Sequence, residues 1–254
     1  MKIFGLIGYP LTHSFSKRYF SEKFRKENLS AHAYLNFPLN ELSVIKDLVT
    51  SNPEISGLNV TIPFKENIIF YLEELDETAR EVGAVNTVHV GRNDNNIHLT
   101  GYNTDVTGFS RSLTPLLPTG LKNALILGTG GASKAVAYVL AKQNIDYLTV
   151  SRNPKDISQI PYSRIDKNIL EQYLLIINTT PLGMHPDVDN CPDIPYEYLT
   201  KHHICYDLVY NPEITLFLEK SKEKGAITKN GLEMLHIQAE AAWEIWNNKK
   251  SNTL

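Results

Sequence analysis

Residues 124–133 read Ala-Leu-Ile-Leu-Gly-Thr-Gly-Gly-Ala-Ser, a short apolar run that ends in a glycine-rich turn. An apolar run before such a turn predicts a buried strand. The segment after it carries Val136 and Leu140 on one helical stripe. Gly128 permits the tight turn, and Gly130 lets the backbone approach a pyrophosphate at the positive end of the helix dipole. The stretch therefore predicts a strand–turn–helix unit that binds a dinucleotide.

This turn departs from the usual fingerprint because Ser133 replaces the third glycine, although serine is small enough for helix–strand packing. A tight structural turn with no ligand is the alternative for such a motif alone. Its place between a clear strand and a clear helix favours nucleotide binding. Further apolar runs predict strands at 147–150, 174–178 and 204–208. We therefore predict a doubly wound, Rossmann-type sheet in this half of the chain.

The residues after the next strand bear on the choice of cofactor. An NAD site usually presents an acid there for the ribose hydroxyls. This chain instead has Ser151-Arg152-Asn153-Pro154-Lys155. A guanidinium pairs bidentately with phosphate, so Arg152 suits the 2′-phosphate of NADP. A solvated surface arginine is the alternative.

The first half of the chain alternates strand and helix signals. Apolar runs predict strands at 3–8, 33–37 and 57–62, and amphipathic segments predict helices at 17–28 and 41–49. Such an order is typical of a mostly parallel sheet with crossover helices.

Two α/β domains are expected from these patterns. Residues 1–105 form one domain, onto which a final helix within 232–254 packs back, and residues 106–231 form the dinucleotide domain. The stretch 93–96 is rich in asparagine and predicts a turn between two strands.

Composition excludes several classes of protein. The net charge is −3, with no basic block, so nucleic acid is not an expected partner. The first residues read as a strand and not as a signal peptide, and no apolar stretch is long enough to cross a bilayer. Neither the two cysteines nor the eight histidines have a metal-ligand spacing, so no metal is expected. We expect a soluble cytoplasmic protein.

Polar residues stand at the predicted strand ends of the first half. Asn59 and Thr61 lie on one face of a strand whose end delivers Lys65 to the carboxyl edge, where open α/β sheets bind ligands. Asn86 and Asp105 lie near later strand ends. A ketone oxygen gains negative charge during reduction, and an ammonium such as Lys65 stabilises and protonates it, with Asp105 as its partner. Each residue alone is more simply a surface charge or a salt bridge.

Eight motifs, in this order, resemble the shikimate dehydrogenases along nearly the whole chain. They are Gly8–Ser16 (GYPLTHSFS), Asn59–Glu66 (NVTIPFKE), Gly83–Thr87 (GAVNT), Gly101–Asp105 (GYNTD), Gly128–Ser133 (GTGGAS), Asn178–Met184 (NTTPLGM), Tyr206–Tyr210 (YDLVY) and Asn230–Leu235 (NGLEML). The resemblance implies reversible reduction of 3-dehydroshikimate by NADPH, with the substrate cleft between the two domains, within aromatic amino-acid (chorismate) biosynthesis.

The same resemblance assigns the site residues. Lys65 and Asp105 would be catalytic. Substrate contacts would come from Ser14, Ser16, Asn59, Thr61, Asn86, Thr104, Tyr210 and Gln238. Cofactor contacts would come from Glu77, Gly128, Thr129, Gly130, Gly131, Ala132, Ser151, Arg152, Asn153, Leu208 and Gly231. Gln238 also stands out by itself, because it lies on the apolar face of the last predicted helix and a buried amide there needs partners.

The sequence departs from the family pattern at two places. Lys17 replaces a proline that often follows the second serine, and the basic cluster after Val150 is shorter than is common. The alternatives are an NAD-dependent quinate/shikimate dehydrogenase, for which an acid after Val150 would be expected, and a non-catalytic cofactor-binding relative, which would be expected to lack Lys65 or Asp105. A monomer or a homodimer fits the sequence equally.

Overall fold

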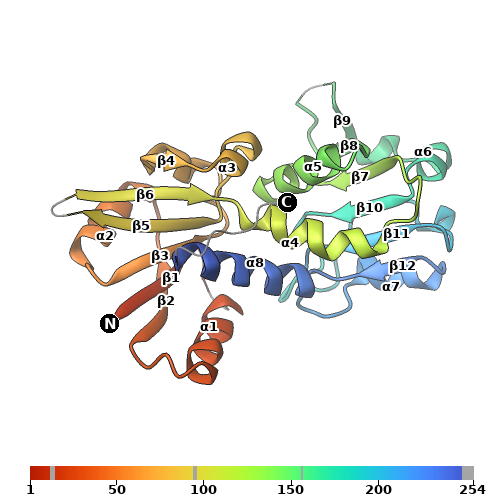
Figure 1. The fold of residues 1–254 in the computed structure, drawn as a ribbon. Coiled ribbons are helices and arrows are strands. Elements are labelled where there is room, and N and C mark those ends of the chain that lie inside the picture. The colour runs from red at the N-terminus through yellow and green to blue at the C-terminus, as the bar shows by residue number, and fades with distance from the viewer. Residues whose placement is uncertain (12–14, 94–95, 156, 248–254) are drawn as a thin grey trace. The chain divides into compact units, whose positions relative to one another are not determined.

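The computed structural model describes residues 1–11, 15–93, 96–155 and 157–247 (Figure 1). The chain divides into two compact units: unit 1 comprises Met1–Thr107 and Gln238–Leu254, and unit 2 comprises Gly108–Ile237. The divisions fall inside the helices α4 (Thr104–Leu113) and α8 (Leu232–Trp246), and not at the predicted positions 105/106 and 231/232. The difference arises because a continuous helix carries no break in its sequence pattern.

Unit 1 is built around a mixed six-stranded sheet of order β2-β1-β3-β5-β6-β4. Its other elements in chain order are β1 (Lys2–Gly8), α1 (Phe15–Lys26), β2 (His32–Pro38), η1 (Leu42–Val44), α2 (Ile45–Ser51), β3 (Ile55–Val60), η2 (Asn67–Tyr71), β4 (Glu74–Leu75), α3 (Glu77–Val82), β5 (Thr87–Asn93) and β6 (Asn96–Tyr102). The strands β1, β2 and β3 are parallel, as predicted, whereas β5 runs antiparallel to both β3 and β6.

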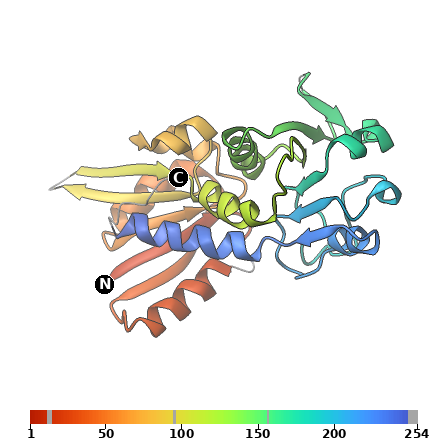
Figure 2. The same cartoon turned by 45° about the vertical axis from the view of Figure 1, so that its right-hand side comes forward.

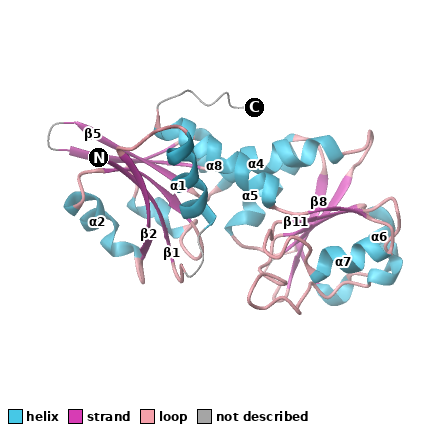
Figure 3. Cartoon of the chain, turned by 90° about the horizontal axis from the view of Figure 1, so that it is seen from below, coloured by secondary structure: helices cyan, strands magenta, loops and turns pink. Residues whose placement is uncertain are grey.

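Side chains that alternate along β1 bury both faces of this sheet. Phe4 and Leu6 face a cluster contributed by α1 and α8, whereas Ile3 and Ile7 face a cluster that includes α2. Figure 2 shows α8 beside α1 over the sheet, and Figure 3 shows α2 on its other side. The sheet is therefore the middle layer of unit 1. Because both of its faces are covered by apolar side chains, polar residues are expected at its carboxyl edge.

Unit 2 contains a parallel six-stranded sheet of order β12-β11-β10-β7-β8-β9. Its elements after α4 are η3 (Thr114–Leu116), β7 (Asn123–Leu127), α5 (Gly131–Lys142), β8 (Asp146–Ser151), β9 (Gln159–Pro161), η4 (Tyr162–Arg164), α6 (Lys167–Gln172), β10 (Leu175–Asn178), η5 (Tyr196–Tyr198), β11 (Ile204–Asp207), α7 (Leu216–Glu223) and β12 (Ile227–Lys229). Counted from β7, the spatial order is 3-2-1-4-5-6, the order of dinucleotide-binding folds. The predicted doubly wound sheet is confirmed.

The strand predicted at 57–62 lies two residues earlier, as β3 (Ile55–Val60). The chain turns after Val60, because the Phe64 amide donates to the Thr61 carbonyl at 2.9 Å and closes a turn. Pro63, which has no amide hydrogen, lies within that turn. The turn predicted at 93–96 joins β5 to β6, although its middle residues lie outside the described residues.

A search of the described residues finds no helix with both the length and the apolar character needed to span a bilayer.

Gly57 on β3 makes room for the ring of Trp246 from α8. A Cβ at Gly57 would lie 2.3 Å from two atoms of that ring. The ring also stacks on Phe4, with centroids 4.9 Å apart, and its Nε1 donates to the Val88 carbonyl at 3.0 Å. These contacts hold the end of α8 on the sheet.

We therefore expect Gly57→Ala to destabilise the protein by about 1–3 kcal/mol, because a tightly packed ring must move. Urea unfolding followed by tryptophan fluorescence measures the change. Gly91→Ala on β5 is the matched control: the nearest atom to its Cβ would lie at an ordinary 3.5 Å, so it should be nearly neutral. Equal unfolding midpoints for the two variants would contradict this account.

Candidate active site

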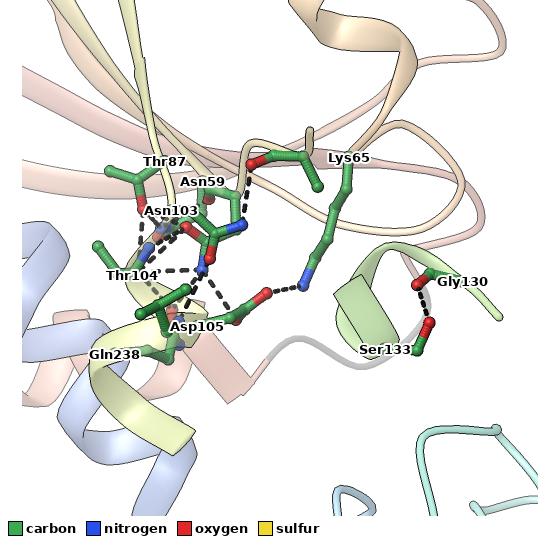
Figure 4. A network of polar contacts seen from close by, with 12 residues as sticks. Asn59, Lys65, Thr87, Asn103, Thr104, Asp105, Gly130, Ser133 and Gln238 are labelled. Carbon is green, nitrogen blue, oxygen red and sulfur yellow. Dashed lines mark hydrogen bonds and ion pairs between the residues drawn. The ribbon is translucent and has the colours of Figure 1, made fainter. Parts of the chain in front are cut away.

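Asn59, near the carboxyl end of β3, begins a network of buried polar groups in unit 1 (Figure 4). It is 5% exposed, and its Oδ1 accepts from the Tyr34 hydroxyl at 2.7 Å. Its Nδ2 donates to Thr87 Oγ1 at 3.2 Å and to the Asn86 carbonyl at 3.4 Å. Both ends of the carboxamide are therefore engaged, which fixes its orientation.

Asn86 is the centre of this network. Its Oδ1 accepts from the Thr104 backbone amide at 2.7 Å, at the beginning of α4. Its Nδ2 donates to Asp105 Oδ1 at 2.8 Å and, at 3.4 Å, to Gln238 Oε1 from α8. One buried carboxamide thus satisfies an amide hydrogen of the first helical turn and orients a carboxylate on that same turn.

Lys65 and Asp105 form an ion pair, with 2.5 Å between Nζ and Oδ2. The lysine side chain is 18% exposed and that of the aspartate 8%. The backbone of Lys65 is also held, because its carbonyl accepts from the Val85 amide at 2.7 Å. Figure 4 shows the ammonium pointing at the carboxylate, whose other oxygen is bound by Asn86. A cation and an anion are therefore held beside several amide groups.

Gln238 joins the network from α8, at 8% exposure. Its Oε1 accepts from the Thr104 hydroxyl at 3.3 Å. The buried amide predicted on this helix is therefore present, and its Oε1 is bonded to side-chain donors of unit 1.

Four predicted substrate residues remain: Ser14, Ser16, Thr61 and Tyr210. Ser14 lies outside the described residues. Ser16 is the second residue of α1 and hydrogen-bonds to Tyr34, whose pKa is raised by burial and lowered in part by that bond. Thr61 is half-buried after β3, with its amide bonded to the Ile7 carbonyl. Tyr210 is half-buried in unit 2.

The glycine-rich turn follows β7, the first strand of the unit 2 sheet along the chain. Gly128 has a φ of +111° and would place a Cβ 2.7 Å from Thr179 Oγ1, so glycine is required there. A Cβ at Gly130 would meet nothing within 4 Å, and this residue precedes the first turn of α5. The Ser133 hydroxyl donates to the Gly130 carbonyl at 2.6 Å. Thr129, Gly131 and Ala132 complete this turn at the helix N-terminus.

Three further candidates lie at the end of β8 and directly after it. Ser151 ends that strand and its Oγ accepts from the Asn153 amide at 3.2 Å. Arg152 is exposed and lies close to Tyr162, whose pKa is raised by burial and lowered in part by the guanidinium. No acid follows Val150 before Lys155. The exposure of Arg152 makes its guanidinium accessible from solvent.

Leu208 and Gly231 are brought together backbone to backbone. A Cβ at Gly231 would lie 2.1 Å from the Leu208 carbonyl oxygen, and the Gly231 amide donates to the Val209 carbonyl at 3.1 Å. Glu77 is an exposed residue of α3 in unit 1, whereas the other cofactor candidates belong to unit 2.

Sequence reasoning missed several buried polar residues. Thr87 and Asn103, at 0% and 5% exposure, stand within quoted motifs but were assigned no role. Asp207 was missed as well: it is fully buried and accepts from Asn178 Nδ2, the Val209 amide and Thr215 Oγ1. The sequence signal available for Asp207 was a charged residue at the end of an otherwise uncharged, buried strand. Within the described ranges, no group of three His, Cys, Asp or Glu residues is arranged to hold a metal.

Comparisons with known proteins agree on one family. The sequence model described as "Shikimate dehydrogenase substrate binding domain" matches residues 6–88. The chain is 39% identical to a protein of Methanococcus maripaludis strain C6 named "Shikimate dehydrogenase (NADP(+))", over 98% of this chain and 92% of the relative.

Solved structures give the same result. The shikimate dehydrogenase of Aquifex aeolicus superposes with a TM-score of 0.86 at 33% identity, covering 98% of this chain and 93% of that one. The Thermus thermophilus enzyme, solved with NADP(H) and shikimate, gives 0.83 at 28% identity, covering 98% and 94%.

The buried Asp207 predicts a pH dependence of stability. Burial raises its pKa from 3.8 to about 6, although three hydrogen bonds oppose the shift. Between these values the folded state keeps a proton that the unfolded state has released. Its contribution to stability is therefore complete below pH 3.8 and is lost as the pH rises through about 6.

We expect the unfolding free energy of the wild type, relative to Asp207→Asn, to fall between pH 4 and pH 6 by at most about 1.4 kcal/mol per pH unit. Urea unfolding of both proteins across this range measures the difference, to which their other titrating groups contribute equally. A difference that rises with pH would contradict the raised pKa.

Proposed function

The chain belongs to the shikimate dehydrogenase family, and from that premise we propose that it catalyses the reversible NADPH-dependent reduction of 3-dehydroshikimate to shikimate. The observation that carries the proposal is the Lys65–Asp105 ion pair, joined through Asn86 to a set of buried amides and hydroxyls. A hydroxylated ring with one ketone requires such a set: donors and acceptors for its hydroxyls, and an acid for its ketone oxygen.

The substrate carboxylate would be held by Ser14 and Ser16, as in the family pattern. Two serine hydroxyls donate well to one carboxylate, and the position of Ser16 in the first turn of α1 supports this assignment. The ring hydroxyls would be bound by Asn59, Thr61, Asn86, Thr104, Asp105, Tyr210 and Gln238. The support for most of these is that their polar groups already share one hydrogen-bond network.

NADP fits the candidate residues of unit 2. The open space over Gly130 at the N-terminus of α5 suits a pyrophosphate, and the exposed Arg152 suits a 2′-phosphate. Thr129, Gly131, Ala132, Ser151 and Asn153 would support these contacts, and Leu208 and Gly231 would pack against the cofactor. Glu77 of α3 would add a further cofactor contact. The bound cofactor supplies or accepts the hydride.

The proton is the part of the reaction that the chain itself handles. Lys65 Nζ would stabilise the growing negative charge on the ketone oxygen and donate a proton to it, and in the reverse direction would accept the hydroxyl proton. Asp105 would orient the ammonium, and Asn86 would hold Asp105 in place. The product would serve aromatic amino-acid (chorismate) biosynthesis, and we expect a cytoplasmic monomer or homodimer.

Absorbance of the nicotinamide at 340 nm is the direct test of the proposal, with shikimate or quinate as substrate and NADP or NAD as cofactor. Shikimate with NADP should give the highest kcat/KM. In Arg152→Ala, KM for NADP should rise tenfold or more with KM for NAD nearly unchanged, because only NADP has the 2′-phosphate. Lys155→Ala is the control for a general loss of positive charge. Preference for quinate with NAD would replace the proposed reaction, and absence of turnover would overturn it.

Removal of either member of the ion pair should lower kcat. We expect Lys65→Ala to lower kcat by roughly a hundredfold or more with a much smaller change in KM. Asp105→Asn keeps the shape and one acceptor, and should also lower kcat strongly. The double variant should be little worse than the worse single variant, because residues that act as a unit are not additive. Fully multiplicative losses would assign Asp105 to substrate binding alone.

A further inference from the structure

Thr87, the first residue of β5, has its side chain fully buried within the polar network. One hydroxyl contacts three polar side chains: Asn59 Nδ2 at 3.2 Å, Asn86 Oδ1 at 3.1 Å and Thr104 Oγ1 at 3.2 Å. At 0% exposure, this hydroxyl meets protein groups and is shielded from any ligand.

The antiparallel pairing of β5 with β3 places this hydroxyl. In that register Thr87 is the direct partner of Asn59, and residues paired in this way present their side chains on the same face of the sheet. A parallel strand would require a different connection and a different neighbour. The turn of the chain into β5 therefore sets a hydroxyl beside the Asn59 carboxamide.

The donors and acceptors around the Thr87 hydroxyl determine which hydrogen bonds it accepts and which it donates. It has one proton to donate and two lone pairs that accept. Asn59 Nδ2 is always a donor, so Thr87 accepts from it and donates its own proton to Asn86 Oδ1 or to Thr104 Oγ1. A rotated Asn59 carboxamide would bring its oxygen to face the Asn86 carbonyl oxygen, which Nδ2 now approaches, and two acceptors would be opposed.

We propose that Thr87 is a positioning residue, whose hydroxyl sets the orientation of the Asn59 and Asn86 carboxamides for the hydroxyls of shikimate without reaching the substrate. This inference rests on the proposed function, because it supposes that these carboxamides bind shikimate. Without the hydroxyl, Asn59 Nδ2 loses its side-chain acceptor, and Asn86 Oδ1 loses one of its donors. A buried amide without its partners reorients or recruits water.

Thr87→Val tests the proposal, because it replaces the hydroxyl by a methyl group of similar size. We expect KM for shikimate to rise roughly tenfold, with a smaller change in kcat and an unchanged KM for NADP. Thr87→Ser, which keeps the hydroxyl, should restore most of the affinity for shikimate. If the valine variant does not fold, Thr87→Ala carries the same expectation.

Thr215→Val is the matched control. Thr215 is also a fully buried threonine with a bonded hydroxyl, but it lies in unit 2, where it donates to Asp207. Its loss should lower the Tm and leave KM for shikimate unchanged. If Thr87→Val also lowers only the Tm, or raises both KM values equally, the positioning role is overturned while the proposed function stands. Absence of turnover by the wild type would overturn the proposed function, and this inference with it.

Discussion

The candidate site depends on one buried carboxamide, that of Asn86. A helix that begins inside a protein leaves amide hydrogens without partners, and a buried carboxylate needs donors. Asn86 meets both needs on the first turn of α4, since its oxygen accepts from the Thr104 amide and its nitrogen donates to Asp105. The position of Asp105, and through it that of Lys65, therefore follows from a requirement of helix formation.

Polar groups gather at this edge of the unit 1 sheet because the hydrophobic layers are complete elsewhere. The two faces of the sheet are covered by apolar clusters, one with α1 and α8 and the other with α2. Burial of so many amides and hydroxyls is tolerable only where each finds a partner, and a fully satisfied network holds one arrangement rigidly. Rigidity of this kind is what recognition of a small hydroxylated ring demands.

Much of this organisation could be predicted from the sequence. The apolar run and glycine turn of residues 124–133, with the apolar runs that follow, predicted the doubly wound sheet that is observed. This was possible because hydrophobic periodicity and turn chemistry are local properties of the sequence. Lys65 and Asp105, 40 residues apart, were expected to meet, and they form an ion pair. The antiparallel course of β5 was not foreseen, because strand direction is set by non-local pairing. The buried roles of Thr87 and Asp207 were missed for the same reason: their partners lie on other strands and in loops.

Both divisions between the units fall within helices, and this has a consequence for how such a protein changes over evolutionary time. Only the first residues of α4, Thr104–Thr107, belong to unit 1. In α8, the residues before Gln238 belong to unit 2 and those from Gln238 onward belong to unit 1. A helix forms cooperatively, so neither helix survives as a fragment of one turn. A recombination event that exchanged one unit for a foreign one would have to join two helices in register, with Asp105 and Gln238 still facing their partners. Exchange of either unit therefore requires matched helix ends at both crossings, whereas a point substitution within a unit requires none.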